Sequence, residues 1–181
     1  MSFIYVASDL HFGHKNIAQF RQIAGISNEE EHREFLISRW NTTVTKRDTV
    51  FVLGDACFDE ESLEHIARLK GAKVLVRGNH DVLSAATYLT VFKDVEGMVR
   101  TKASWLTHAP IHPDELRGKL NVHGHVHFNT INDRRYRNVS MENLIGFRPH
   151  KLSEVISTPE TCLIAVGKRI TEEVLYGEVK M

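Results

Sequence analysis

The chain has 181 residues, of which 42% are hydrophobic and 25% are charged, a composition typical of one soluble globular domain. Lysine plus arginine and aspartate plus glutamate number 23 each, so the net charge is zero. A neutral chain has no global field to attract nucleic acid or an anionic membrane. We therefore expect residues 1–181 to form a single domain that holds any anionic partner locally.

Signals for transport and for disulfide formation are both weak in this sequence. No apolar run approaches the ~20 residues needed to cross a bilayer, and residues 1–6 lack the basic region and long apolar stretch of a secretory signal. Cys57 and Cys162 are too few for a disulfide framework and lack metal-site spacing. The prediction is a cytoplasmic protein with reduced thiols and no membrane partner.

Five short apolar runs predict strands. They cover residues 3–7, 49–53, 73–76, 104–107 and 120–122. Continuous apolar runs of this length suit strands that are buried on both faces of a sheet. Each run ends in polar residues that are able to bind a metal ion.

Helical patterns separate the first of these runs. Ser27 with Glu30 forms a capping-box pattern before a helix that reaches about Trp40. Asp59 is placed to cap a second helix, with Gly71 as its stop. Alternating strands and helices imply parallel crossover units whose ligands gather at the carboxyl ends of the strands.

The second half of the chain is richer in strands. From about residue 91 onward, residues 134–141 and 161–166 are further strand candidates, and residues 152–156 predict one short helix. No internal repeat or composition break marks a domain boundary. The expected fold class is α/β (α+β), with two packed sheets and helices outside them.

Eleven histidines stand out in this neutral chain, and their positions coincide with the strand ends. In extended backbone, residues two apart point to one side of the sheet, so Asp9 with His11 and His125 with His127 could each share a cation. Each such fragment is common by itself, but the ordered series is not. The series reads Asp9-x-His11, Gly54-Asp55, Gly78-Asn79-His80-Asp81, His108, and Gly124-His125-x-His127.

This series resembles the five sequence blocks of the calcineurin-like metallophosphoesterase superfamily, in order and across residues 9–127. The resemblance implies a four-layer α-β-β-α sandwich of two mixed sheets flanked by helices, with little room for a cap domain. It also implies two divalent metal ions bridged by Asp55, of which manganese is favoured, although iron, zinc and nickel also suit such ligands. The implied ligands are Asp9, His11, Asp55 and His127 for one ion, and Asp55, Asn79, His108 and His125 for the other.

The same resemblance assigns the catalytic chemistry. Two divalent ions clamp a phosphate and supply a bridging hydroxide that attacks phosphorus. His80 matches the family's catalytic histidine, which touches a substrate oxygen and protonates the leaving alkoxide as general acid. Asp81 either orients His80 or caps the following helix, and the sequence does not choose between these roles.

Departures from the family pattern limit the classes of substrate that we expect. The protein phosphatase branch extends the second block with an aspartate and a phosphate-gripping arginine, and both are missing from residues 54–60 here. The nearest motif cation, Arg77, lies where strand alternation turns it away. The chain therefore resembles small bacterial and phage members, and we expect it to hydrolyse phosphodiesters of small molecules or nucleotides.

Three alternatives stay open. The protein could be a phosphomonoesterase, a nuclease, or a catalytically silent interaction scaffold of the same fold. The scaffold is disfavoured because every ligand position keeps a competent residue type. A nuclease needs a path for a polyanion, and no extended basic patch is evident beyond the run Arg134, Arg135 and Arg137, of which strand alternation sends the last two to one face.

Several residues near the motifs have weaker assignments. The amide of Asn16 follows the first metal loop closely enough to meet a phosphate oxygen, together with Asn79 and His80, or it simply begins a helix. His14, His112 and His123 flank the motifs and could support the ligands from behind. His32, His65 and His150 are assigned no role.

Overall fold

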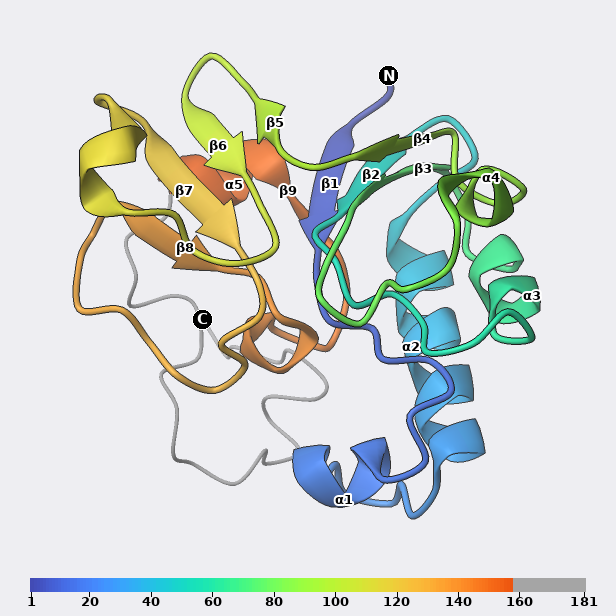
Figure 1. Cartoon of the computed structure of the whole chain (residues 1–181). Coiled ribbons are helices and arrows are strands. Elements are labelled where there is room, and N and C mark those ends of the chain that lie inside the picture. The colour runs from blue at the N-terminus through green and yellow to red at the C-terminus, as the bar shows by residue number, and fades with distance from the viewer. Residues whose placement is uncertain (158–181) are drawn as a thin grey trace.

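The computed structural model describes residues 1–157 as two mixed β-sheets with helices around them (Figure 1). The first sheet has the order β4-β3-β2-β1-β9, in which β1 to β4 run parallel and β9 runs antiparallel to β1. Its strands are Ile4–Ala7 (β1), Thr49–Val52 (β2), Ala72–Val76 (β3), Asp94–Glu96 (β4) and His150–Lys151 (β9). The predicted strands of the first half therefore have nearly the expected bounds.

The second sheet has the order β5-β6-β7-β8, with β5 antiparallel to β6 and the other pairs parallel. Its strands are Val99–Arg100 (β5), Ser104–Leu106 (β6), Leu120–His123 (β7) and Tyr136–Asn138 (β8). The predicted strand over residues 134–141 is thus much shorter than expected. The predicted strand over residues 161–166, like Cys162, lies outside the described residues.

Seven helical elements connect the strands. They are Ile17–Arg21 (α1), Glu29–Thr43 (α2), Leu63–Ala67 (α3), Ala85–Tyr88 (α4), Leu152–Ser157 (α5) and the 3-10 helices Pro113–Leu116 (η1) and Met141–Asn143 (η2) within the described chain. In Figure 1, α2, α3 and α4 lie on the side of the first sheet that faces away from the second sheet. Two mixed sheets flanked by helices confirm the predicted fold class.

The helix starts differ from prediction by a residue or more. Asn28, not Ser27, caps α2, accepting a hydrogen bond from the Glu31 amide at 2.9 Å. Ser27 instead donates to the Glu31 carboxylate, so the capping box uses the next acid along. Asp59 accepts from the amide of Ser62, one turn before α3 begins. Residues 29–31 are all glutamates, so sequence spacing alone cannot tell which of them accepts the hydrogen bonds of the capping box.

One hydrophobic core joins the two sheets. Val6, Val52 and Leu75 from the first sheet pack in the same buried cluster as Leu106 and Val122 from the second. The helices contribute Leu36 and Trp40 of α2 and Ile66 of α3. This shared core fixes the relative position of the loops at the ends of both sheets. No described helix has the length and apolar character to cross a bilayer.

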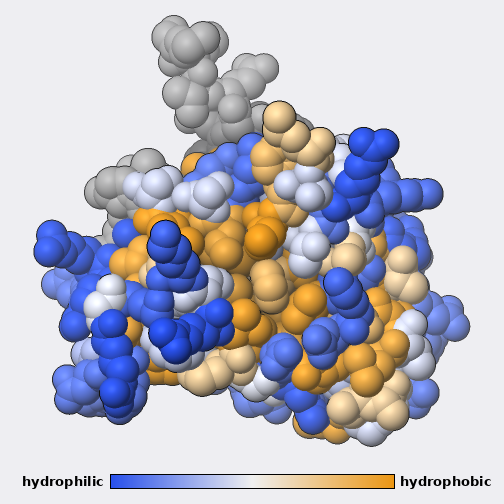
Figure 2. Space-filling view, turned by 90° about the horizontal axis from the view of Figure 1, so that it is seen from above, coloured by the Kyte–Doolittle hydropathy of each residue, from blue (hydrophilic) through white to orange (hydrophobic). Residues whose placement is uncertain are grey.

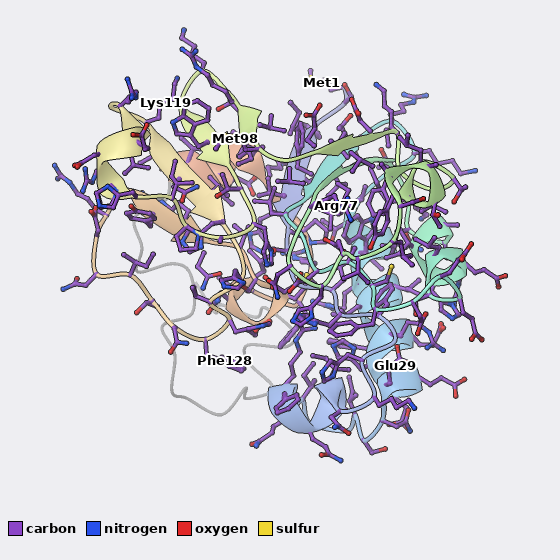
Figure 3. The ribbon with its side chains drawn as sticks, in the orientation of Figure 1. Met1, Glu29, Arg77, Met98, Lys119 and Phe128 are labelled. Carbon is purple, nitrogen blue, oxygen red and sulfur yellow. The ribbon has the colours of Figure 1, made fainter. Side chains whose placement is uncertain are left out.

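One end of the molecule has an apolar surface, and the first sheet is oriented relative to it. The end seen in Figure 2 carries a patch of apolar side chains bordered by charged ones. Met1 and Met98, both exposed, lie at this end in Figure 3, whereas Phe128 and Glu29 lie at the opposite end. The parallel strands β1 to β3 point away from the apolar patch (Figure 1), so their carboxyl ends open toward the other end.

Candidate metal centre

The seven predicted ligands lie in loops that follow strands at one edge of the two sheets. Two hydrogen bonds from backbone amides hold these loops together: the Asp9 amide donates to the Gly54 carbonyl at 3.0 Å, and the His125 amide donates to the Asp9 carboxylate at 3.0 Å. The second contact ties a loop of one sheet to a loop of the other. Asp9 and His11 follow β1, Asp55 follows β2, Asn79 follows β3, His108 follows β6, and His125 and His127 follow β7.

One group of potential ligand atoms surrounds Asp9. The His11 Nε2 atom lies 3.6 Å from Asp9 Oδ1 and 3.9 Å from Asp55 Oδ2. One ligand atom from each of Asp9, His11 and His127 lies within 4.8 Å of the others, and the same holds for Asp9, Asp55 and His108. Asp55 reaches toward both groups, since its Oδ2 is also 3.5 Å from His108 Nε2.

A second group is tighter. The Asn79 Oδ1 atom lies 2.8 Å from His108 Nε2 and 3.0 Å from His125 Nδ1, and the two imidazole atoms are 3.1 Å apart. Neighbouring ligands of an octahedral ion at about 2.1 Å are separated by about 3.0 Å. The spacing of these three atoms therefore fits a shared divalent cation.

The hydrogen bonds of the histidines leave lone pairs where a metal needs them. His108 directs Nδ1 at the Leu53 carbonyl, 2.8 Å away, and His127 directs Nδ1 at the Glu142 carboxylate, 2.6 Å away. Both contacts place the proton on Nδ1 and free Nε2 as a ligand atom. His11 is buried, and neither ring nitrogen has a hydrogen-bond partner among the described residues. A buried imidazole without a hydrogen-bond partner is expected at a position that binds a metal ion.

The ligand loops have strained backbone. Residues 1–157 contain eight non-glycine residues with positive φ, and five of them are predicted ligands. Left-handed backbone is costly for these residue types and persists where the surroundings enforce it, as at functional sites. The expected extended backbone was therefore wrong, although the side chains do converge. The φ angles are 59° for Asp9, 56° for His11, 52° for Asp55, 71° for His125 and 51° for His127.

Two motif glycines make room for ligands. A Cβ atom on Gly124 would lie 2.4 Å from Asp9 Oδ2 and 1.9 Å from Ser8 Oγ, and one on Gly78 would lie 2.2 Å from Asp55 Oδ1. Contacts this short cannot be accommodated without moving the ligand. The glycines before Asn79 and His125 are therefore required by close packing behind the metal ligands.

Asp81 has neither of its two predicted roles. Its carboxylate accepts backbone hydrogen bonds from Asp55 (2.8 Å), Ala56 (2.9 Å) and Gly78 (2.7 Å), and α4 is capped by Ser84 instead. Burial raises the pKa of Asp81 despite these donors. Asp81 thus fastens the loop after β2 to the loop after β3, which is a structural role that local sequence cannot indicate.

His80 stands at the mouth of the cluster. Its side chain is 46% exposed, and Nε2 lies 4.0 Å from Asp55 Oδ2. The ring stacks on Phe58 with centroids 4.8 Å apart and planes inclined by 25°. Phe58 was not singled out from the sequence, although it follows Asp55 by three residues. The stacking fixes an accessible imidazole beside the ligands.

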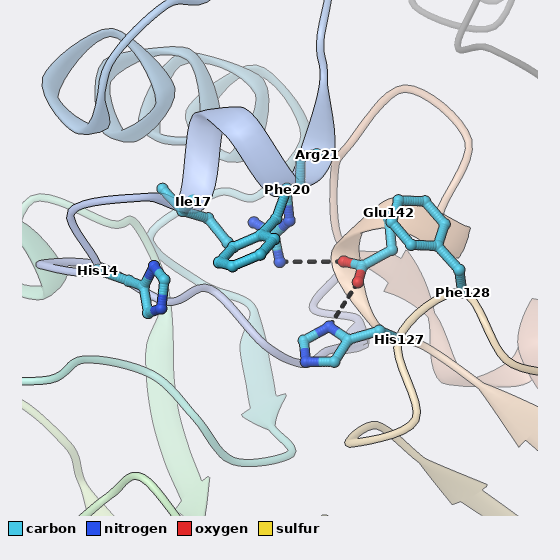
Figure 4. A pocket seen from close by; sticks show the side chains of 7 residues that line it. All are labelled: His14, Ile17, Phe20, Arg21, His127, Phe128 and Glu142. Carbon is cyan, nitrogen blue, oxygen red and sulfur yellow. Dashed lines mark hydrogen bonds and ion pairs between the residues drawn. The ribbon is translucent and has the colours of Figure 1, made fainter.

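A buried ion network supports His127. The Arg21 guanidinium pairs with Glu142 at 3.0 Å, both side chains are 1% exposed, and the other Glu142 oxygen faces His127 (Figure 4). Arg21 also donates to the Asp9 carbonyl and, at 2.8 Å, to Nε2 of His32. Burial alone would raise the pKa of Glu142, but Arg21 and His127 hold it below its usual value.

This network was missed from the sequence. Arg21, His32 and Glu142 are far apart along the chain and match no local motif. The only local signal was an acidic residue shortly after β8, a feature that many loops share. His32, assigned no role beforehand, is buried and neutral beneath the site.

Of the four residues with weaker assignments, two lie against the ligand cluster and two are exposed at the start of a helix. The ring of His14 meets that of His11 edge-on at 5.9 Å, so this side chain does contact a predicted ligand, and it also lines the cavity beside His127. His123 is buried under the site and bonds to the Gly124 carbonyl. Asn16 is exposed at the start of α1 and makes no capping bond, and His112 is exposed at the start of η1.

The arginine run is not a basic patch. Arg137 is buried and donates to the carbonyls of Val155 and Arg134, while Arg135 is exposed and pairs with Asp133. The predicted alternation was wrong because β8 begins only at Tyr136. Arg77 lines the cavity beside Asn79 and His108, but its guanidinium is engaged by the carbonyls of Asp81 and Leu83.

Two cavities flank the cluster. The His127 cavity, about 360 Å³, lies between α1 and the loop after β7, with walls of Ile17, Phe20 and Phe128 (Figure 4). The His125 cavity, about 380 Å³, adjoins Asn79, His108 and His125 on the other side, with Met98 and Ile111 in its walls. The cluster therefore has a recess on each side.

Comparison with known proteins agrees with this geometry. Residues 4–169 match the calcineurin-like phosphoesterase family. The chain belongs to this family. It is 30% identical over 173 residues to an uncharacterized protein of Methanocaldococcus jannaschii, covering 87% of this chain and 91% of that one.

Further relatives have similar size. The protein is 30% identical to the Gene 66 protein of Mycobacterium phage L5, over 70% of this chain and 78% of that one. A protein of unknown function from Aquifex aeolicus has the same fold, with a TM-score of 0.67 at 22% identity, covering 86% of this chain and 98% of that one. Family membership and the Asp and His cluster make this chain a metal-dependent phosphoesterase.

Proposed function

We propose that the protein is a dinuclear phosphodiesterase for small diesters or nucleotides. Two divalent cations held by the seven ligands, with manganese favoured, would neutralise the phosphate and supply hydroxide at neutral pH. Asp55 contributes to both ligand groups because its Oδ2 atom lies 3.9 Å from His11 Nε2 and 3.5 Å from His108 Nε2. This convergence of ligands is the observation that carries the proposal.

His80 is the proposed general acid. Its accessible imidazole lies next to Asp55 without belonging to either ligand group, so it can meet a substrate oxygen. Stacking on Phe58 restricts the ring, which lowers the entropy lost when the ring takes its position for proton transfer. In this role His80 donates a proton to the leaving alkoxide as its bond to phosphorus breaks.

Two features favour a diester over a monoester. A monoester presents a dianion and commonly calls for an added cationic side chain, but Arg77 is bound to carbonyls and Arg21 is neutralised by Glu142. A diester carries two ester groups, and the His127 and His125 cavities provide a recess for each.

A metal-by-substrate matrix tests the proposal. Metal-stripped protein is assayed with each candidate metal on bis(4-nitrophenyl) phosphate, 4-nitrophenyl phosphate, 2′,3′- and 3′,5′-cyclic nucleotides and single-stranded DNA. We expect Mn²⁺ to restore hydrolysis, with a higher kcat/KM for the diester than for the monoester. A preference for the monoester at saturating metal and several pH values would overturn the diester assignment, and no hydrolysis with any metal would favour the scaffold.

A further inference from the structure

The His127 cavity combines aromatic walls with a charged floor. Phe20 of α1 and Phe128 of the loop after β7 lie on two sides of it, and the floor is the Arg21–Glu142–His127 network (Figure 4). Phe20 is 64% exposed, although a phenylalanine on a short amphipathic helix can usually bury its ring. The exposed ring at this position is therefore available to a ligand.

The cavity is also placed to receive part of the substrate. His127 lies in its lining and in the ligand group with Asp9 and His11. A phosphate held at the ligands would have one ester group directed past His127 into this space. With a volume of about 360 Å³, the cavity lies in the range of small-ligand sites.

The chemistry of the lining selects the ligand. From this arrangement, which rests on the proposed function, we infer that the His127 cavity binds the base of a nucleotide, stacked against Phe20 and Phe128. Aromatic rings stack on any base and gain little specific contact from a flexible hydrocarbon chain.

Binding of two phosphates that differ only in the base tests this inference. Adenosine 5′-monophosphate and ribose 5-phosphate are titrated separately into Mn²⁺-loaded protein by calorimetry. We expect the nucleotide to bind about tenfold tighter or more, the usual gain from one stacked base. Phe20→Ala and Phe128→Ala should each remove most of this difference and leave ribose 5-phosphate binding unchanged.

Controls separate the subsite from other effects. Phe3→Ala removes a phenylalanine that is 43% exposed and precedes the amino end of β1, opposite to the end that the ligands follow, and should change neither affinity. Equal binding of the two phosphates to wild type would overturn the inference, as would a nucleotide preference that survives both cavity variants. Tight hexyl phosphate binding that the variants abolish would assign the cavity to an alkyl chain instead.

Different experimental outcomes would overturn the proposed base subsite and the proposed reaction. A nucleotide preference that depends on Phe20 in a protein without hydrolytic activity would retain the subsite and overturn the proposed reaction. Hydrolysis of model diesters without any preference for the base would retain the reaction and overturn the subsite.

Discussion

The carboxylate of Glu142 accepts a hydrogen bond from Nδ1 of His127 over 2.6 Å. This contact fixes the tautomer and orientation of a metal ligand from a residue 15 positions later in the chain. Arg21 in turn neutralises Glu142 and reaches the carbonyl of Asp9. The buried network thus connects two ligands of the same group.

Glu142→Gln should weaken metal binding. The amide keeps the shape of the side chain but loses the charge that holds His127 and pairs with Arg21. Loss of such a contact behind a ligand costs about 10- to 100-fold in metal affinity, which competition with a chelator would measure. Glu115→Gln, which alters an exposed pair with Arg117, should leave the affinity unchanged. A folded Glu142→Gln protein with wild-type affinity would show that the network does not support the metal.

His80→Ala should separate metal binding from proton transfer. The His80 imidazole lies 4.0 Å from Asp55, and the hydrogen bond from the His80 amide to Asp55 survives the substitution, so most of the bound metal should remain. The rate should fall by roughly 10²- to 10⁴-fold. The loss should shrink for diesters with very acidic leaving groups, which need no protonation. His125→Ala should instead lose metal and activity together. Equal losses across a leaving-group series would contradict the acid role of His80.

Gly124→Ala should damage both stability and the metal site. The added Cβ would meet Asp9 and Ser8 at impossible distances, and overpacking of this kind costs about 1–3 kcal/mol. Chemical denaturation of the metal-free protein measures the free energy of unfolding. Gly97→Ala is the matched control, because a Cβ there has nothing within 4 Å. If the two variants were equally stable, the close packing behind Asp9 would not constrain the loop.

Stability of the metal-free protein should fall in mild acid because buried histidines resist protonation. Burial and the adjacent Arg21 lower the pKa of His32 from 6.5 to about 2, and burial lowers that of His123 to about 4. Below pH 6.5 these histidines bind protons in the unfolded chain but not in the folded protein, so the free energy of unfolding decreases as pH falls. Each such histidine contributes about 1.4 kcal/mol per pH unit.

The variant His32→Gln isolates one of these contributions. Glutamine does not titrate, and its carbonyl can accept the bond from Arg21, so the free energy of unfolding should depend less steeply on pH between 6.5 and 5. His112→Gln, at an exposed position, should keep the wild-type slope. An unchanged slope in His32→Gln would mean that His32 is charged in the folded protein.

Local sequence patterns were enough to predict the five strands that lead into the ligand loops. Apolar runs report burial directly, which is why β2 begins at Thr49 as predicted and β1 differs from prediction at only one end. The motif residues converge because parallel strands share a carboxyl edge. The fold class followed from the alternation of these runs with helical segments.

Contacts between distant segments were beyond the reach of the same patterns. Asp81 bonds to amides 25 and 26 residues earlier, and Glu142 pairs with Arg21 across 121 residues. The left-handed backbone of Asp9 and His11 is likewise imposed by tertiary contacts, since residues of these types prefer other conformations when isolated. These features depend on how the two sheets pack, and the local periodicity of apolar residues does not predict that packing.

Titration of the metal-free protein with Mn²⁺ tests the central claim most directly, with bound metal and hydrolysis of bis(4-nitrophenyl) phosphate measured on the same samples. We predict that activity rises to a plateau at two equivalents per chain, and that Asp55→Asn lowers both the metal bound and the rate because this carboxylate faces both ligand groups. Full activity at one equivalent, or hydrolysis without metal, would contradict the dinuclear site.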